Sequence, residues 1–348
     1  MTRAIYSACV SLICFSSVMA SAQTYTVTDL GGVNSIGLAI APNGNAVGQS
    51  DASFGFFWSP SRGLSRLAGL PGGDSSQANG INAGGVIAGE ATVNVEDFVL
   101  NHAAIWTDGE IQDLGTLTTL GQSWANAINS AGQVVGAANP EDNNPHAFLW
   151  TKATGMQDLG TLPGGSYCQA LAINRFGQVA GYSDLADGVT FGFAWSKATG
   201  MQNLGSLPGG GGSSANAIND LGQIAGGSGC GGACIHAVLW TKTVGSVQDL
   251  GLLSGSIYSS ATGINNKGQV VGSAGFSLAP NHAVIWSQPA GMQDLNDLIP
   301  ANSGWTLQYA NAINDDGQIT GQGTINGKVH AFLLTPVTEN SKSLESDN

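Results

Sequence analysis

Residues 146–165 read HAFLWTKATGMQDLGTLPGG, and close variants of this run return along the chain. Each copy also contains an Ala-Ile-Asn-like segment, a Gly-Gln turn and an apolar Val-Val-Gly segment, which come before the run. The tryptophan of the run marks the copies at Trp58, Trp106, Trp150, Trp195, Trp240 and Trp286, with Leu334 in the seventh copy. Successive copies are 44 to 48 residues apart. A period of this length indicates a solenoid, a propeller or an array.

Each copy contains two predicted β-hairpins. In the third copy, residues 125–129 and 133–137 flank a Ser-Ala-Gly turn, whose glycine supplies the positive φ that such a turn requires. The second hairpin pairs residues 146–150 with residues 156–159. These short strands are apolar on both faces, which favours sheets buried between neighbouring sheets. Since no stretch after the first 22 residues has helical periodicity, we expect an all-β chain.

Four short antiparallel strands per copy are typical of a β-propeller blade. The first three strands of the unit occur seven times, whereas the first copy of the fourth strand, residues 25–30, precedes the first blade. No equivalent strand follows residues 330–334. We therefore predict a seven-bladed β-propeller with four-stranded blades, in which the N-terminal strand completes the last blade and closes the ring. Closure removes exposed sheet edges, whereas the alternative, a linear β-solenoid, predicts no such offset and needs capping ends.

Four motifs of the repeat carry a resemblance to a known family. They are HAFLW at 146–150, MQDLGTLPGG at 156–165, AIN at 172–174 and GQVAG at 177–181. They resemble the HAF-repeat family of predicted extracellular bacterial proteins, over roughly residues 24–337. The resemblance implies export and repetition, and it transfers no reaction. Copies one and four depart from the family pattern, because Phe54 and Phe191 replace the histidine.

The first 22 residues have the features of a secretory signal peptide. Arg3 supplies the positive start, residues 4–20 are apolar, and Ala20-Ser21-Ala22 is a small-x-small site for cleavage after Ala22. We expect export to the periplasm or beyond the cell. We also expect a single propeller domain over residues 23–338 and a polar, disordered tail over residues 339–348.

The chain is acidic, weakly charged and rich in glycine. Its net charge is −13, charged residues make up 9% of it, and 52 residues are glycine. An acidic surface is a poor partner for nucleic acid and for anionic membranes. No stretch after the signal is long and apolar enough to span a bilayer. We therefore expect no nucleic acid partner and no membrane insertion. We also expect the protein to be a monomer.

Three cysteines follow the signal peptide. Cys230 and Cys234 bracket three residues, and export favours a disulfide between them. We predict no zinc site there, because the pair lacks a second ligand pair and the nearby His236 belongs to the repeat. Cys168 is left over, and we expect it to be buried rather than reactive.

The repeated polar residues have structural interpretations. The five histidines share one repeat position, at His102, His146, His236, His282 and His330. A half-buried histidine that hydrogen-bonds a neighbouring strand explains this position, which also accepts phenylalanine, better than a ring of metal ligands does. The aspartate of the Met-Gln-Asp segment recurs as a turn or cap residue, and the tryptophans pack between blades. The sequence has no nucleophile elbow, HExxH motif, phosphate loop or haem-attachment motif, so we assign no catalytic or metal-binding residue.

Function is better sought where the copies differ. The second-to-third strand loops and the links between blades emerge on one side of a propeller, called here the variable-loop face. Acidic residues lie in these loops of blades two, three and four: Glu96, Asp97, Glu141, Asp142, Asp184 and Asp187. Aromatic residues lie in or beside the inter-blade links: Trp124, Tyr167, Tyr258, Trp305 and Tyr309.

These two sets are the candidate ligand-binding residues. Aromatic rings on a rigid scaffold can stack on sugars, and carboxylates can bind hydroxyls, a cation or a basic peptide. We predict a secreted binding module whose ligand, a glycan or an extracellular protein, lies on the variable-loop face. The alternative is an exported carbohydrate-active hydrolase or lyase that uses two of these acids about 5–10 Å apart. A structural surface or matrix component is a further alternative and predicts a flat face. We predict no cofactor, with calcium held by the acidic loops as the alternative.

Overall fold

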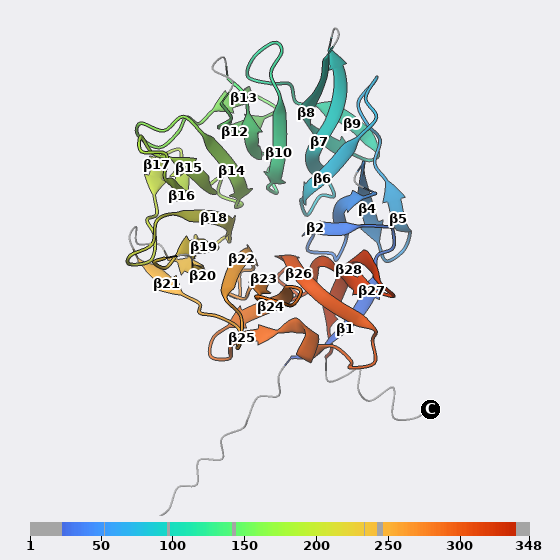
Figure 1. The fold of residues 1–348 in the computed structure, drawn as a ribbon. Helices are drawn as coiled ribbons and strands as arrows, with labels where there is room; N and C mark the ends of the chain where they lie inside the picture. Colours follow the sequence, from blue (N-terminus) through green and yellow to red (C-terminus); the bar gives the residue numbers. More distant parts are fainter. Residues whose placement is uncertain are drawn as a thin grey trace, which may run out of the picture.

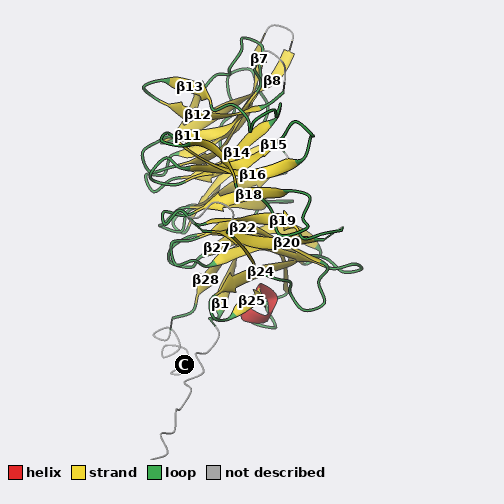
Figure 2. Cartoon of the chain, turned by 90° about the vertical axis from the view of Figure 1, so that its left-hand side faces the viewer, coloured by secondary structure: helices red, strands yellow, loops and turns green. Residues whose placement is uncertain are grey.

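The structure, a computed structural model, describes residues 23–338 except residues 52, 96–97, 141–143, 233 and 242–245. These residues form seven four-stranded antiparallel sheets arranged in a ring (Figure 1). In the view turned by 90°, loops lie on both sides of the stacked sheets (Figure 2). The fold is the predicted seven-bladed β-propeller. The predicted signal peptide and C-terminal tail lie outside the described residues.

Blades one to six add their strands in chain order from the centre outward, and blade seven does so for its first three strands. The innermost strands are β2 (Ile36–Ile40), β6 (Ser76–Ile81), β10 (Ser123–Ile128), β14 (Cys168–Ile173), β18 (Ser213–Ile218), β22 (Tyr258–Ile264) and β26 (Trp305–Ile313). The second strands are β3 (Ala46–Ser50), β7 (Ile87–Val95), β11 (Val134–Ala138), β15 (Val179–Asp184), β19 (Ile224–Gly229), β23 (Val270–Gly275) and β27 (Ile319–Ile325). The third strands are β4 (Phe54–Ser59), β8 (Phe98–Thr107), β12 (His146–Thr151), β16 (Thr190–Ser196), β20 (Ile235–Trp240), β24 (His282–Ser287) and β28 (Lys328–Pro336). The outer strands of blades one to six are β5 (Gly63–Arg66), β9 (Glu110–Asp113), β13 (Gly155–Asp158), β17 (Gly200–Asn203), β21 (Val247–Asp249) and β25 (Gly291–Asp294). A short 3-10 helix, η1 (Leu295–Leu298), follows β25.

The N-terminal strand β1 (Tyr25–Asp29) is the outer strand of blade seven. It pairs antiparallel with β28, from Tyr25 opposite Pro336 to Asp29 opposite Phe332. Figure 1 shows this contact as blue β1 beside red β28. The side chains of Tyr25 and Leu30 are buried, so the closing strand is part of the core. The predicted closure of the ring by this strand is confirmed.

The hydrophobic core lies between neighbouring blades. Phe148 and Trp150 of β12 pack with Ile105 and Leu114 of blade two, whereas Leu149 of the same strand packs with blade four. Because successive side chains of a strand point to opposite faces, each blade is buried on both sides. The tryptophan series therefore packs between blades, as predicted.

Every inner strand contains a register shift at the same repeat position. In blade three the shift falls between Ala125 and Ala127, opposite Gly136. A Cβ atom at Gly136 would overlap the backbone oxygen of Trp124, which explains why this glycine recurs in all copies. The residue after this glycine, Ala137, pairs with Trp124.

The asparagine of the Ala-Ile-Asn segment joins neighbouring blades on the face opposite the variable loops, called here the turn face. Asn129 Oδ1 accepts hydrogen bonds from the N–H groups of Ala131 and Gln133, both at 3.0 Å, which closes the first turn of the blade. Asn129 Nδ2 donates to the backbone oxygen of Asn174 in the next blade at 3.1 Å. The same inter-blade bond is made by Asn82, Asn129, Asn174, Asn219, Asn265 and Asn314.

Candidate ligand-binding pocket

A pocket of about 290 Å³ lies between blades two, three and four. It is lined by Gln77, Asn79, Glu90, Trp124, Asn126, Ala137, Pro145, Tyr167 and Gln169. Trp124 and Gln169 stand at the starts of inner strands, and Pro145 precedes a third strand, so the pocket belongs to the variable-loop face. We call it the Glu90 pocket.

The walls of the Glu90 pocket come from a strand position that differs among the copies. At this position Gln77 pairs with Glu90, Trp124 with Ala137, and Gln169 with Tyr182. The corresponding pairs in the other blades are Ile36–Gln49, Ser214–Gly227, Ser260–Ser273 and Tyr309–Gln322. Blades two to four, where the pocket lies, thus carry large polar and aromatic side chains at this position, as blade seven also does.

Glu90 is the acidic residue of the pocket lining. Its Oε2 atom is buried and has no hydrogen-bond partner among the described residues. Burial raises the pKa of Glu90 from 4.5 to about 7. The carboxyl group therefore keeps its proton in mildly acidic solution, where it can donate a hydrogen bond. A buried polar atom without a partner points to a ligand or a water molecule that supplies one.

Tyr167 lines the blade-four side of the pocket, and Tyr182 packs beside Tyr167 without lining the pocket. The rings of Tyr167 and Tyr182 stack with centroids 5.9 Å apart and planes 25° apart. The Tyr182 hydroxyl donates to Gln169 Oε1 at 2.5 Å. Burial raises the pKa of Tyr182, which keeps this hydroxyl protonated as a donor. The bond fixes the orientation of the Gln169 amide in the lining.

The structure brings two of the five predicted aromatic residues together, Trp124 and Tyr167. Trp305 lies elsewhere: it packs edge-on against Phe332 beside the core of blade seven. Its role is to fill space at a blade junction, and it lies outside the Glu90 pocket.

Tyr258 and Tyr309 are joined through Asn281, outside the Glu90 pocket. The Tyr258 hydroxyl donates to Asn281 Oδ1 at 2.8 Å, and Asn281 Nδ2 donates to the Tyr309 hydroxyl at 2.6 Å. This chain connects blades six and seven. The two hydroxyls therefore already have partners within the protein.

Two of the predicted acidic residues, Asp184 and Asp187, lie in the described part of the chain, and their carboxylates accept hydrogen bonds from backbone N–H groups of nearby loops. Asp184 Oδ1 accepts the N–H groups of Ser166 and Tyr167 at 2.9 and 2.8 Å, and Asp187 Oδ1 accepts that of Val189 at 3.0 Å. Asp184 thereby positions Tyr167 beside the pocket without lining it. The other candidates, Glu96, Asp97, Glu141 and Asp142, lie outside the described residues.

Glu90 was not predicted from the sequence, because it lies within strand β7 and not in a variable loop. A signal was nonetheless present. The residue after the repeated glycine of the second strand differs in almost every copy: Gln49, Glu90, Ala137, Tyr182, Gly227, Ser273 and Gln322.

The five histidines form a repeated structural pair with aspartate, as predicted. Each Nδ1 atom lies 2.5 to 2.9 Å from a carboxylate oxygen on the outer strand of the same blade. In blade three, Asp158 also accepts the N–H of Gly160 at 2.7 Å, so it caps the chain after β13. The histidine–aspartate pair thus links the third strand of the blade to its outer strand through side chains.

The structure describes all three cysteines that follow the predicted signal peptide. Cys230 and Cys234 form a disulfide. Cys168 is fully buried, and burial raises the pKa of its thiol to about 12. A thiol that stays protonated is a poor nucleophile, so Cys168 has a packing role.

Comparison of the chain with models of known protein families and with curated protein sequences gives no match. Its fold resembles that of virginiamycin B lyase from Staphylococcus aureus, with 7% identity and a TM-score of 0.54 over 90% of this chain and 100% of that chain. It also resembles a prolyl endopeptidase structure, with 11% identity and a TM-score of 0.51 over 73% of this chain. The similarity spans 41% of the prolyl endopeptidase chain. Putative TolB from Agrobacterium tumefaciens is 10% identical, with a TM-score of 0.45 over 91% of this chain and 100% of that chain. At such identities the first two similarities show the propeller fold alone.

Within the part of the chain that the structure describes, no helix has the length and hydropathy that a membrane span requires.

Proposed function

We propose that this propeller is an exported binding module that holds a sugar residue of a glycan in the Glu90 pocket. The observation that supports this proposal is the lining, where Trp124 and Tyr167 stand beside four side-chain amides and the unpartnered Glu90 carboxyl. Aromatic faces pack against the C–H faces of sugars, and amides and carboxyls exchange hydrogen bonds with hydroxyls. The volume is at the small end of ligand sites and suits a group of monosaccharide size.

The proposed setting is outside the cytoplasm, either the periplasm or the cell exterior. The signal-peptide pattern of residues 1–22 and the resemblance to the HAF-repeat family both support export. We also propose that the protein acts as a monomer, because a closed ring presents no inner sheet edge for pairing with a second copy. Size-exclusion chromatography with light scattering tests the oligomeric state.

Glu90 supports a second candidate function, that of a carbohydrate-active hydrolase or lyase. A carboxyl group with a pKa of about 7 can act as a general acid near neutral pH. Hydrolysis of a glycosidic bond also uses a second carboxylate about 5–10 Å away. Binding needs no group beyond the described lining, so it is the function that the pocket supports best. A purely structural role predicted a flat face, which the pocket does not fit.

A glycan array probed with the mature chain from Gln23 tests the binding proposal. We expect the parent to bind, and Trp124→Ala and Tyr167→Ala to lose binding while they keep the parental Tm. Tyr309→Ala is the matched control, because Tyr309 occupies the repeat position of Trp124 in blade seven. The same assay with calcium tests the alternative that the loops at 96–97 and 141–142 hold a cation. A parent that binds no glycan contradicts the proposal and favours an extracellular protein as the ligand.

Glu90→Gln separates the binding module from the enzyme. The amide keeps a hydrogen-bond donor in place but cannot transfer a proton. A binding module should therefore retain affinity in this variant. If the parent cleaves the bound glycan and Glu90→Gln does not, the enzyme function replaces the binding function.

A further inference from the structure

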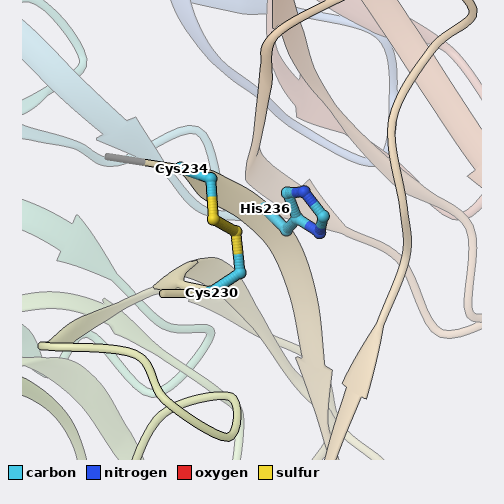
Figure 3. A group of neighbouring side chains, drawn as sticks. All are labelled: Cys230, Cys234 and His236. Atoms are coloured by element: carbon cyan, nitrogen blue, oxygen red, sulfur yellow. A yellow bond between two sulfur atoms is a disulfide. The ribbon is translucent and has the colours of Figure 1, made fainter. Parts of the chain in front are cut away.

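We propose that blade five carries a redox-controlled zinc site built from Cys230, Cys234 and His236. One potential ligand atom from each residue lies within 4.8 Å of the other two. Figure 3 shows the His236 ring beside the two cysteines, whose sulfur atoms are joined in the disulfide. The proposal concerns the reduced form of the protein, in which two thiols replace the disulfide. It does not depend on the function of the Glu90 pocket.

The donor set fits zinc. Two thiolates and one imidazole are ligands that zinc prefers, with Zn–S distances of about 2.3 Å and Zn–N distances of about 2.0 Å. The Cα atoms of Cys230 and Cys234 are 5.6 Å apart, so both sulfur atoms can reach one ion. Three protein ligands leave the fourth tetrahedral position for water or another ligand. The sequence predicted no zinc site here, because the cysteines lack a second ligand pair and His236 belongs to the repeat. The structure brings a ligand atom of His236 within 4.8 Å of both sulfur atoms.

Asp249 orients His236 for this role. His236 Nδ1 lies 2.9 Å from Asp249 Oδ2, which leaves Nε2 as the nitrogen that can bind a metal. A carboxylate on the second ring nitrogen is the common partner of zinc-binding histidines, because it fixes the tautomer and the ring orientation. Asp249 is itself anchored, since its Oδ1 accepts the N–H of Gly251 at 2.8 Å.

The two cysteines are specific to blade five and are not residues of the repeated motif. The other four histidines keep the same aspartate pair, and no cysteine occupies the second-to-third strand loop of their blades. In blade five, Gly231 and Gly232 have φ values of 96° and 66°, which allow the chain to fold back after Cys230. Cys230 and Cys234 are only half-buried, so reagents can reach them.

The switch is a balanced two-electron reaction. An external dithiol gives two electrons and two protons to the Cys230–Cys234 disulfide, and the dithiol becomes a disulfide. The S–S bond of the protein breaks and two thiols form. Zinc then binds the two thiolates, and the two displaced protons pass to water. An external disulfide reverses the step: it takes two electrons from the two thiolates, its own S–S bond breaks into two thiols with two protons from water, and the Cys230–Cys234 S–S bond forms again. The ion thereby loses both sulfur ligands and is released.

Zinc titration of the mature protein before and after reduction tests the proposal. The protein is reduced anaerobically with a dithiol, the reductant is removed, and binding is measured by calorimetry. Cobalt(II) is the second probe, because a thiolate-to-cobalt absorption band reports sulfur ligation. We expect the reduced protein to bind one zinc ion per chain and the oxidised protein to bind none at this position. Cys230→Ser should lose the cobalt band.

Two histidine variants make the test specific. His236→Phe introduces the residue that copies one and four carry at this repeat position, so the blade should keep its fold. It should weaken zinc binding by the reduced protein at least tenfold, as should the partner variant Asp249→Asn, for which about 10- to 100-fold is expected. His282→Phe is the matched control, because it removes the same histidine–aspartate pair in blade six, and zinc affinity should not change. Failure of the reduced protein to bind zinc, equal binding by the oxidised protein, or equal losses in His236→Phe and His282→Phe would each overturn the proposal.

Discussion

Asn314 Nδ2 donates a hydrogen bond of 3.1 Å to the backbone oxygen of Ala41, and this bond joins the last blade of the ring to the first. Equivalent bonds link blades two to seven in succession. The series stops at Ala41, because alanine has no amide to donate to Asn82 in blade two. Blades one and two are therefore held together without a bond that every other pair of neighbours has.

Ala41→Asn should supply the inter-blade hydrogen bond that blades one and two lack, and should stabilise the protein. The new side chain can donate to the backbone of Asn82, and a hydrogen bond of this kind contributes about 1 kcal/mol. Urea denaturation monitored by circular dichroism measures the change. A variant that unfolds at a lower urea concentration than the parent would show that this position cannot accommodate the amide.

The reverse substitution, Asn174→Ala, is the control for that prediction. It removes the donor to the Asn219 backbone and the acceptor of the N–H groups of Phe176 and Gln178. Three hydrogen bonds are lost at about 1 kcal/mol each, so we expect a loss of about 2–3 kcal/mol. An unchanged free energy of unfolding would mean that the asparagine series has no role in stability.

Removal of β1 tests whether closure stabilises the whole ring. Deletion of residues 24–30 exposes the edge of β28 and removes the buried Tyr25 and Leu30, so blade seven should unfold and the remaining ring should melt at a lower temperature. The milder variant Leu30→Ala should cost about 2–5 kcal/mol. Thermal unfolding followed by circular dichroism checks both. A truncated chain that melts like the parent contradicts the role given to closure.

The fold was predictable because its causes repeat. One copy of the motif indicates where strands begin, which glycines lie in turns and which side chains are buried. The other six copies give the same pattern, so each assignment is supported several times. The position of residues 25–30 before the first complete blade was enough to predict closure by β1. The two-sided apolar strands likewise predicted that Trp150 and its equivalents lie between blades.

The site was only partly predictable, because a single sequence does not show which variable residues converge in space. Trp124 and Trp305 both precede or begin inner strands, yet Trp124 lines the pocket and Trp305 packs against Phe332. Asp184 varies among the copies because it supports a local loop. Glu90 lies within β7 between Gly89 and Ala91, and its place in a pocket depends on side chains from two other blades.

The two tryptophans should therefore differ in their effect on stability. Trp305→Ala removes a ring that packs on the core of blade seven and should cost about 3 kcal/mol or more. Trp124→Ala enlarges an existing pocket and should cost less than Trp305→Ala, because fewer packing contacts are lost. Chemical denaturation of both variants measures the two free energies of unfolding. The reverse order would indicate that Trp124 is a packing residue and would weaken its assignment to ligand binding.

The ionisation of Glu90 should couple stability to pH. Its pKa is about 7 in the folded protein and 4.5 in the reference state, so between these values the folded protein holds a proton that the unfolded chain has lost. The free energy of unfolding therefore falls as pH rises through this range. The raised pKa corresponds to a loss of about 3 kcal/mol once Glu90 is ionised. Glu90→Gln should remove this dependence, so the variant should match the parent at low pH and exceed its stability above neutrality.

Urea denaturation across the same pH range, with exposed Glu110→Gln as the matched acid control, measures this effect. Parallel pH profiles for the parent and Glu90→Gln would contradict the burial of an ionisable Glu90. A glycan that accepts a hydrogen bond from the protonated carboxyl must favour the protonated protein. Its affinity for the parent should therefore weaken as pH rises through the pKa of Glu90, and its affinity for Glu90→Gln should not. If stability and affinity change over the same pH interval in the parent, a single group controls both, and that group lies in the pocket.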